Sequence, residues 1–179
     1  MMLKVLLLIV LLISGGIADQ APLIMMRHAL APGMGDPAEF KLGDCATQRN
    51  LSQEGRQQAE NAGMLLKREG VTSAQVLTSA WCRCRDTARL MDIGEVEVFP
   101  ALNSFFRARE NEKGQMEELR KWIRDWDGKT PTVMVTHQVV MTALTGSFPA
   151  SGEMWFLKRD DAGGVVIDRR VQVPLGLSE

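Results

Sequence analysis

Two short apolar runs, each ending at a histidine, constrain the fold of this chain more than any other feature. Residues 23–26 (Leu-Ile-Met-Met) lead directly into Arg27 and His28, and residues 132–136 (Thr-Val-Met-Val-Thr) lead into His137. A short apolar run without helical periodicity is typical of a buried strand, although a buried helical segment can have the same pattern. Ligands of open α/β sheets bind just outside the carboxyl ends of the strands. The two histidines of the chain therefore mark a candidate ligand site at one edge of a sheet.

Strands and helices are expected to alternate along the rest of the chain. Ser52 can cap a helix that Gly70 follows. We expect helices over 52–68, around 83–88, over 112–127 and over 139–144, strands over 74–78 and 96–102, and a C-terminal hairpin of 153–158 and 165–173. This alternation predicts an α/β fold, a three-layer αβα arrangement with a mostly parallel central sheet and helices on both faces. The C-terminal β-hairpin would add antiparallel edge strands.

The first residues have the pattern of a signal peptide. Lys4 precedes an apolar stretch over 5–13, and Gly16 and Ala18 supply small residues before a cleavage site after Ala18. We therefore predict a signal peptide over 1–18 and a single domain over 19–179. The apolar stretch is shorter than the roughly 20 residues of a transmembrane helix, so no stable membrane span is expected after cleavage; an uncleaved anchor is the alternative. The protein is expected to be exported, and periplasmic if it is bacterial.

Charge and cysteine content narrow the class of partner. The chain carries 21 basic and 22 acidic residues, and a net charge of −1 gives no global attraction for nucleic acid. The three cysteines, Cys45, Cys82 and Cys84, allow at most one internal disulfide. Buried, unpaired cysteines are the favoured interpretation. A bridge from Cys45 to either Cys82 or Cys84 is the alternative that an oxidising compartment would permit.

The residue types at the predicted sheet edge favour phosphoryl chemistry. Arginine presents a planar fork of N–H donors that matches phosphate oxygens, and a neutral imidazole can attack as a nucleophile and form a covalent intermediate. The segment 29–50 contains several Gly and Pro residues and is long for a loop, which is typical of a functional loop. The sequence has neither a Gly-rich phosphate-binding loop nor a His-x₃-His pair, which argues against a nucleotide-driven ATPase and a zincin-like metal site.

Four segments, in order, resemble signatures of the histidine phosphatase (phosphoglycerate mutase-like) superfamily. Residues 26–29 (Met-Arg-His-Ala) resemble its Arg-His-Gly/Ala signature, and residues 49–59 (Arg-Asn-Leu-Ser-Gln-Glu-Gly-Arg-Gln-Gln-Ala) resemble its Leu-Thr-x-x-Gly-x-x-Gln-Ala helix start. Residues 78–88 (Thr-Ser-Ala-Trp-Cys-Arg-Cys-Arg-Asp-Thr-Ala) resemble Ser-Ser-Pro-x-x-Arg-Ala-x-x-Thr-Ala, and residues 135–137 (Val-Thr-His) resemble Val-Ser/Thr-His-Gly. The resemblance covers about residues 23–146. Within the superfamily, the chain resembles branch 1, and in particular its short phosphohistidine-phosphatase-like or envelope-phosphatase members.

The resemblance implies a role for four residues. His28 would be the phosphorylated nucleophile, Arg27 and Arg83 would bind the phosphoryl group, and His137 would steady it from the opposite side. The family needs no metal or other cofactor. Taken singly, each histidine is more simply explained as a buried residue at the end of a strand. Arg83, taken singly, is more simply explained as a solvated residue of a helix, although Arg85 could equally be the exposed arginine of that helix.

The sequence departs from the family pattern where a proton donor is expected. The family often carries a glutamate two residues after a leucine, but here Ser104 stands in that place after Leu102. Either the leaving group needs little protonation or another carboxylate serves as the donor, and the candidates are Glu110 first, then Glu112, Asp36 and Glu153. The missing acid argues against a mutase, which must protonate and deprotonate a hydroxyl in turn. Gln138 replaces a family glycine and is expected to fill part of the pocket, and Ala80 replaces a proline.

We therefore predict a metal-independent phosphatase that hydrolyses a phosphate monoester through a phosphohistidine on His28. The expected substrate is a small phosphorylated molecule or an envelope sugar phosphate. Two further sets of side chains are candidates for the site, unless they are ordinary surface or core residues: Arg49, Arg107 and Arg109 for a positive mouth, and Trp81, Trp155, Phe105 and Phe106 for stacking on a sugar or lipid. The alternative is a catalytically weak or inactive phosphate-ligand binding protein on the same fold.

Overall fold

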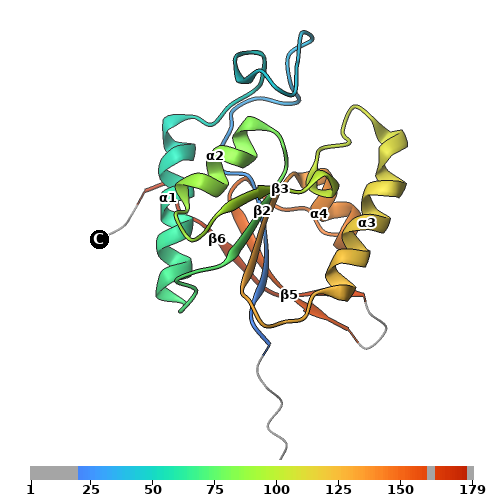
Figure 1. Cartoon of the computed structure of the whole chain (residues 1–179). Helices are drawn as coiled ribbons and strands as arrows, with labels where there is room; N and C mark the ends of the chain where they lie inside the picture. The colour runs from blue at the N-terminus through green and yellow to red at the C-terminus, as the bar shows by residue number, and fades with distance from the viewer. Residues whose placement is uncertain (1–19, 161–163, 177–179) are drawn as a thin grey trace, which may run out of the picture.

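The computed structural model describes residues 20–160 and 164–176, which form a six-stranded sheet flanked by helices (Figure 1). The strands are β1 (Leu23–Arg27), β2 (Gln75–Thr78), β3 (Val96–Val98), β4 (Thr132–Thr136), β5 (Glu153–Arg159) and β6 (Val165–Gln172). The helices are α1 (Gln53–Arg68), α2 (Cys82–Leu90), α3 (Glu112–Asp125) and α4 (Gln138–Thr145). The predicted signal peptide, residues 1–18, lies outside the described residues.

The order of the strands across the sheet is β3-β2-β4-β1-β5-β6. The first four strands in this order run parallel to one another, and β1 lies beside β4 with Arg27 opposite Thr136. The strands β5 and β6 form the predicted hairpin, and β5 pairs antiparallel with β1. The predicted α/β fold with a mostly parallel sheet is therefore confirmed, and the carboxyl ends of β1, β2 and β4 lie at one edge.

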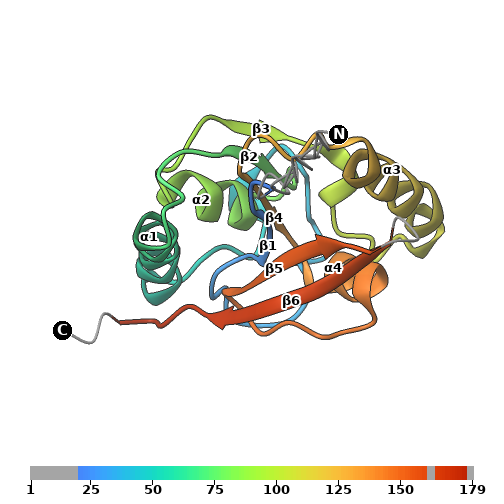
Figure 2. The same ribbon diagram turned by 90° about the horizontal axis from the view of Figure 1, so that it is seen from below.

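Helices cover both faces of the sheet. The core between the sheet and α1 and α2 contains Ile24 and Val135, whereas the core between the sheet and α3 and α4 contains Met25 and Met134. Figure 2, seen from below, shows the two pairs of helices on opposite sides of the strands. Successive side chains of a strand point to opposite faces, and here both faces are buried. This explains why β1 and β4 are continuous apolar runs rather than alternating ones.

The start of α1 is fixed by Ser52 and Gly55. The Ser52 hydroxyl accepts a hydrogen bond from the Gly55 backbone N–H (3.1 Å), which is the predicted cap. Gly55 also packs against the chain that leaves β1, where an added Cβ would lie 1.9 Å from the Leu30 carbonyl oxygen. The absence of a side chain at this position therefore lets α1 approach the segment that follows His28.

A disulfide between Cys45 and Cys82 ties the loop over 29–50 to the first residue of α2. The interpretation as unpaired cysteines is therefore wrong for these two residues, and Cys84 is the buried free thiol. In addition, the Gln48 side-chain oxygen accepts a hydrogen bond from the Cys82 backbone N–H (3.0 Å). The bridge and this bond fix the N-terminus of α2, which carries Arg83.

Two predicted elements end earlier than expected. The strand predicted over 96–102 ends at Val98, because Pro100 begins a 3₁₀ turn (Pro100–Leu102). The helix predicted over 112–127 ends at Asp125, since Trp126 has an extended backbone. Among the described residues, no helix is both long and apolar enough to cross a membrane.

Candidate active site

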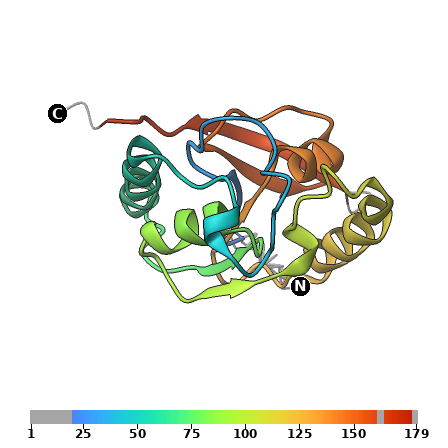
Figure 3. The ribbon, with the colours of Figure 1, turned by 90° about the horizontal axis from the view of Figure 1, so that it is seen from above.

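The carboxyl edge of the parallel strands lies under the loop over 29–50 and the segment 99–111 (Figure 3). His28 follows β1 and His137 follows β4, and these strands are neighbours in the sheet. The centroids of the two imidazole rings are consequently 5.5 Å apart. Arg27 is the last residue of β1, and Arg83 is the second residue of α2. The fold thus brings four residues together at one edge of the sheet, although the first of them, Arg27, and the last, His137, are 110 positions apart in the sequence.

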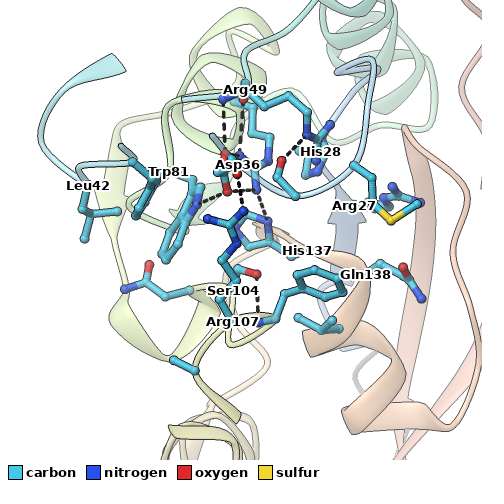
Figure 4. A pocket seen from close by; sticks show the side chains of 18 of the residues that line it. Arg27, His28, Asp36, Leu42, Arg49, Trp81, Ser104, Arg107, His137 and Gln138 are labelled. Atoms are coloured by element: carbon cyan, nitrogen blue, oxygen red, sulfur yellow. Dashed lines mark hydrogen bonds and ion pairs between the residues drawn. The ribbon is translucent and has the colours of Figure 1, made fainter. Parts of the chain in front are cut away.

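A cavity of about 430 Å³ opens at this edge, and Arg27, His28, Arg83 and His137 all line it. The two histidines are almost fully buried, at 2% and 3% exposed. Figure 4 shows them near the centre of the site, with Trp81 on one side and Arg27 on the other. The cavity therefore offers a buried pair of imidazoles beside guanidinium groups.

His28 has the orientation that a nucleophile needs. Its Nδ1 atom lies 2.8 Å from the Ala29 carbonyl oxygen. A carbonyl oxygen only accepts hydrogen bonds, so Nδ1 carries the proton and Nε2 of the neutral ring carries a free lone pair. Burial lowers the pKa of His28 well below its usual value, and the charge of Arg83 lowers it further. His28 is therefore neutral at neutral pH.

His137 is held by a chain of hydrogen bonds. Its Nε2 atom lies 2.8 Å from the Ser79 hydroxyl oxygen, which in turn lies 3.3 Å from Oδ1 of Asn103. The Ala80 backbone N–H also donates to this Oδ1 (2.8 Å). Because Oδ1 accepts from Ser79, the Ser79 oxygen is free to accept the His137 Nε2–H. Burial, followed by the charge of Arg83, lowers the pKa of His137 well below its usual value.

Arg83 contacts Asp36, a residue of the loop over 29–50. Nη1 of Arg83 donates to Oδ1 of Asp36 (2.7 Å) and Nη2 donates to Oδ2 (3.2 Å), with the two side chains 3% and 11% exposed. Trp81 Nε1 and the Arg49 backbone N–H also donate to this carboxylate (3.1 and 3.2 Å). Burial raises the pKa of Asp36, but the bonds and charge of Arg83 outweigh burial and lower it overall. The carboxylate is therefore an internal anion bound to the predicted phosphate-binding arginine.

Other arginines add positive charge to the cavity. Arg49 lines it and donates to the carbonyl oxygens of Gly35 (2.7 Å) and Ala31. Burial and the charge of Arg83 lower the pKa of Arg49 to about 10, which leaves it charged at neutral pH. The Nε atoms of Arg27 and Arg83 are buried and have no hydrogen-bond acceptor in the described part of the chain. The guanidinium groups thus have more donors than protein acceptors, which favours an anion in the cavity.

The structure separates the four candidate proton donors. Asp36 is the one that lines the cavity. Glu110 lies in the exposed 3₁₀ turn Arg109–Asn111 and is not part of the lining. Glu112 pairs with Arg109 (3.3 Å), and Glu153 accepts hydrogen bonds from Ala150 N and Trp155 Nε1 (2.8 and 2.7 Å). Hence the first candidate, Glu110, is not positioned by this geometry to reach a leaving group.

The side chains proposed for the mouth of the site also divide into two groups. Arg107, Trp81 and Phe106 line the cavity, and so does Gln138, in the place of the family glycine. In contrast, Trp155 and Phe105 are completely buried in the core. Arg109 lies outside the cavity lining. The sequence reasoning missed Ser79 and Asn103 as partners of His137, because Ser79 within its motif and Asn103 beside Leu102 give no local signal of the side chain that each contacts.

Comparison with known proteins shows what this sequence is similar to. The sequence profile of the histidine phosphatase superfamily (branch 1) matches residues 23–103. The chain is 32% identical over 128 residues to 2,3-bisphosphoglycerate-dependent phosphoglycerate mutase 2 of Latilactobacillus sakei subsp. sakei (strain 23K), over 62% of this chain and 53% of the mutase. The chain thus spans about half the length of this curated relative.

Solved structures share the fold at low sequence identity. The protein histidine phosphatase SixA complexed with tungstate is similar with a TM-score of 0.60 and 18% identity, over 83% of this chain and 95% of that chain. A putative alpha-ribazole-5'-P phosphatase from Escherichia coli str. K-12 substr. MG1655 is similar with a TM-score of 0.62 and 17% identity, over 89% and 100%. These solved structures share the fold of this chain, and its residues 23–103 are similar to branch 1 of the histidine phosphatase superfamily. Among the described residues, no three His, Cys, Asp or Glu side chains gather as a metal site.

Proposed function

We propose that this protein is an exported phosphatase that hydrolyses phosphate monoesters through a phosphohistidine on His28. The observation that carries the proposal is the orientation of His28, whose Nδ1 is held by the Ala29 carbonyl oxygen while Nε2 remains free in a cavity lined by arginines. Arg27 and Arg83 bind the phosphoryl group in this proposal, and His137, whose Nε2–H is directed to Ser79, lines the cavity beside them. The match of residues 23–103 to the histidine phosphatase superfamily (branch 1) supports the proposal.

The reaction proceeds in two displacements at phosphorus. In the first, the Nε2 lone pair of His28 attacks phosphorus, and the bond to the alcohol oxygen breaks with its electron pair on that oxygen. In the second, a water oxygen attacks the phosphohistidine, the P–N bond breaks, and its electron pair returns to Nε2. One proton of the water stays on the inorganic phosphate, and the other replaces the proton taken up by the alcohol. The arginines stabilise the charge on the phosphoryl oxygens.

The available proton donors favour a hydrolase over a mutase. A mutase must give a proton to one hydroxyl and remove it from another. Asp36 is engaged with Arg83, Trp81 and Arg49, and its lowered pKa keeps it ionised. Glu110 lies outside the cavity lining. Water, in contrast, needs no such pair of residues to release a phosphohistidine whose phosphorus is held by cations.

The disulfide supports export. Structural disulfides persist in oxidising compartments and are rare in the cytosol. The Cys45–Cys82 bridge joins a loop to a helix beside the predicted site. Together with the signal-peptide pattern over 1–18, it favours an extracytoplasmic protein, which is a periplasmic one if the source is bacterial.

One observation favours a second candidate function, phosphate-ligand binding without turnover. The Asp36 carboxylate occupies both terminal nitrogens of Arg83, which are the atoms that a phosphoryl group would use. A binding protein could retain such a competing anion as a gate, whereas an enzyme must displace it or share the arginine in each cycle. Turnover separates the two candidates.

The test is hydrolysis of para-nitrophenyl phosphate from about pH 4 to about pH 8, since a catalytic acid or base shows itself in the pH profile. We expect turnover by the wild type, loss of turnover to background in His28→Ala, and a fall in kcat/KM of about 10²-fold or more in Arg83→Ala. Arg85→Ala is the matched control, because Arg85 lies on the same helix but outside the cavity lining. Phosphate binding without turnover by the wild type would favour the binding protein instead.

A further inference from the structure

The cavity has an apolar wall beside its cationic end. Phe40 and Trp81 stack with ring centroids 5.3 Å apart and planes inclined by 18°. Leu42, Met34 and Phe106 line the same cavity and are 40%, 90% and 49% exposed. Large exposed apolar side chains that gather around a concave site are typical of a ligand-binding surface. We call these five residues the apolar wall.

The apolar wall is held in place by bonds that do not depend on a ligand. Most of its residues belong to the loop over 29–50, which the Cys45–Cys82 disulfide fastens to α2. Arg107, from the segment that carries Phe106, donates hydrogen bonds to the carbonyl oxygens of Asp36 and Pro37. The two segments that supply the wall are therefore joined across the mouth of the cavity, so an apolar group can bind there at little ordering cost.

The same cavity offers no free acid to a departing oxygen. Of the described residues that line it, Asp36 carries the one carboxyl group, and both of its oxygens accept hydrogen bonds from Arg83, Trp81 and Arg49. The Nε2–H of His137 is directed to Ser79 rather than into the cavity. The remaining polar lining residues include Asn103, Ser104, Asn111 and Gln115, which can donate hydrogen bonds but are not acids near neutral pH.

We propose that the substrates of this site are phosphate esters of phenols, with the ring against the apolar wall and the oxygen departing as a weakly basic phenolate. This inference rests on the proposed function and narrows it. His28 Nε2 forms the bond to phosphorus, the P–O bond breaks, and the electron pair leaves on the phenolic oxygen, which takes its proton from solvent. A phenolate needs no protonation at the moment of bond cleavage, so a site without a general acid serves it.

Three substrates separate the two parts of the proposal. Para-nitrophenyl phosphate has an aromatic ring and a weakly basic leaving group. Benzyl phosphate has an aromatic ring and a strongly basic leaving group. Acetyl phosphate has a weakly basic leaving group and no ring. A general acid typically contributes 10²–10⁴-fold. Without one, we expect kcat for benzyl phosphate to be lower than for para-nitrophenyl phosphate by more than about 10²-fold. A benzyl rate within about tenfold of the nitrophenyl rate would show that an acid serves and would overturn the proposal.

The wall is tested with Phe106→Ala. We expect KM to rise roughly 3- to 10-fold for both ring substrates, the range of an aromatic contact, and to stay unchanged for acetyl phosphate. Phe148→Ala is the matched control, because Phe148 is 69% exposed and does not line the cavity. An equal rise in KM for acetyl phosphate, or no rise for the ring substrates, would overturn the role of the wall.

Failure of the proposed function would be seen separately. If none of the three compounds is hydrolysed, the hypothesis that the protein is a phosphatase is wrong. The apolar wall is still tested by calorimetry, which compares the affinities of phenylphosphonate and methylphosphonate. Tighter binding of phenylphosphonate by wild type, reduced by Phe106→Ala and not by Phe148→Ala, would support an aromatic ligand. Equal affinities for the two phosphonates would overturn it.

Discussion

Replacing Asp36 by asparagine should destabilise the empty protein and strengthen its binding of phosphate. The Asp36 carboxylate and the Arg83 guanidinium form an ion pair that is largely buried, at 11% and 3% exposed. Removing one partner of a buried pair costs about 3–5 kcal/mol, because the other charge stays buried. Asparagine keeps the shape and an acceptor oxygen, and Asp36 retains some exposure, so we expect a loss near the lower end, about 3 kcal/mol.

The second effect has the opposite sign because Asp36 competes with phosphate for Arg83. Two unit charges 4 Å apart interact by about 4 kcal/mol at an effective dielectric constant of about 20. Solvent in the open cavity screens this repulsion, and we expect phosphate to bind to Asp36→Asn about tenfold more tightly, a gain of about 1.4 kcal/mol. At a fixed saturating concentration, phosphate should therefore stabilise the variant by about 1.4 kcal/mol more than the wild type.

The assay is urea unfolding with and without inorganic phosphate. Asp125→Asn is the control, since Asp125 is 61% exposed and pairs with Lys121 on the surface of α3, where such a pair contributes less than about 1 kcal/mol. Two results would refute the reasoning. One is a loss in Asp36→Asn no larger than that in the control. The other is phosphate stabilising the wild type as much as Asp36→Asn, which would show that the carboxylate and phosphate do not compete.

Three further predictions concern the fold. Replacing both Cys45 and Cys82 by serine removes a link that closes a 37-residue span, so chain entropy predicts a loss of about 4 kcal/mol in urea unfolding; a loss below about 1 kcal/mol would contradict it. Gly55→Ala should cost about 1–3 kcal/mol or more, because its Cβ would lie 1.9 Å from a carbonyl oxygen, whereas Gly114→Ala in the open part of α3 should stabilise by up to about 1 kcal/mol. The two buried histidines have lowered pKa values in the folded protein, so below about pH 6.5 the unfolded chain binds more protons than the folded one. The free energy of unfolding should therefore fall as the pH is lowered, by up to about 1.4 kcal/mol per pH unit for each histidine. Unfolding midpoints that do not change between about pH 7 and about pH 5 would argue against neutral buried imidazoles.

The strands and the two histidines could be predicted because their signals are local. Residues 23–26 and 132–136 are apolar on both faces, and the polar residues that follow mark the strand ends. The β-sheet then brings His28 beside His137 through pairing of neighbouring strands. The cap at Ser52 is equally local, since its partner Gly55 is three residues away. Such features need no knowledge of which distant segments meet.

The loop contacts could not be predicted because they depend on the tertiary path of 22 residues between His28 and Leu51 (51 − 28 − 1). Cys82 and Cys84 are equivalent in the sequence, but Cys82 begins α2 and reaches Cys45, whereas Cys84 lies in the core beside Thr136. The pairing of Asp36 with Arg83 spans 47 positions and follows no motif. For the same reason the sequence does not show that Asp36, rather than Glu110, is the carboxylate that lines the cavity.

The most direct test of the account is to look for phosphate on His28. The protein is incubated with para-nitrophenyl phosphate, quenched in alkali so that a phosphohistidine survives, and its peptides are mapped by mass spectrometry. We predict phosphate on His28 in the wild type, and more of it if hydrolysis of the phosphohistidine is slower than its formation. We predict neither phosphate nor turnover in His28→Ala. Turnover that continues in His28→Ala, or phosphate found on another residue of the wild type, would contradict the account.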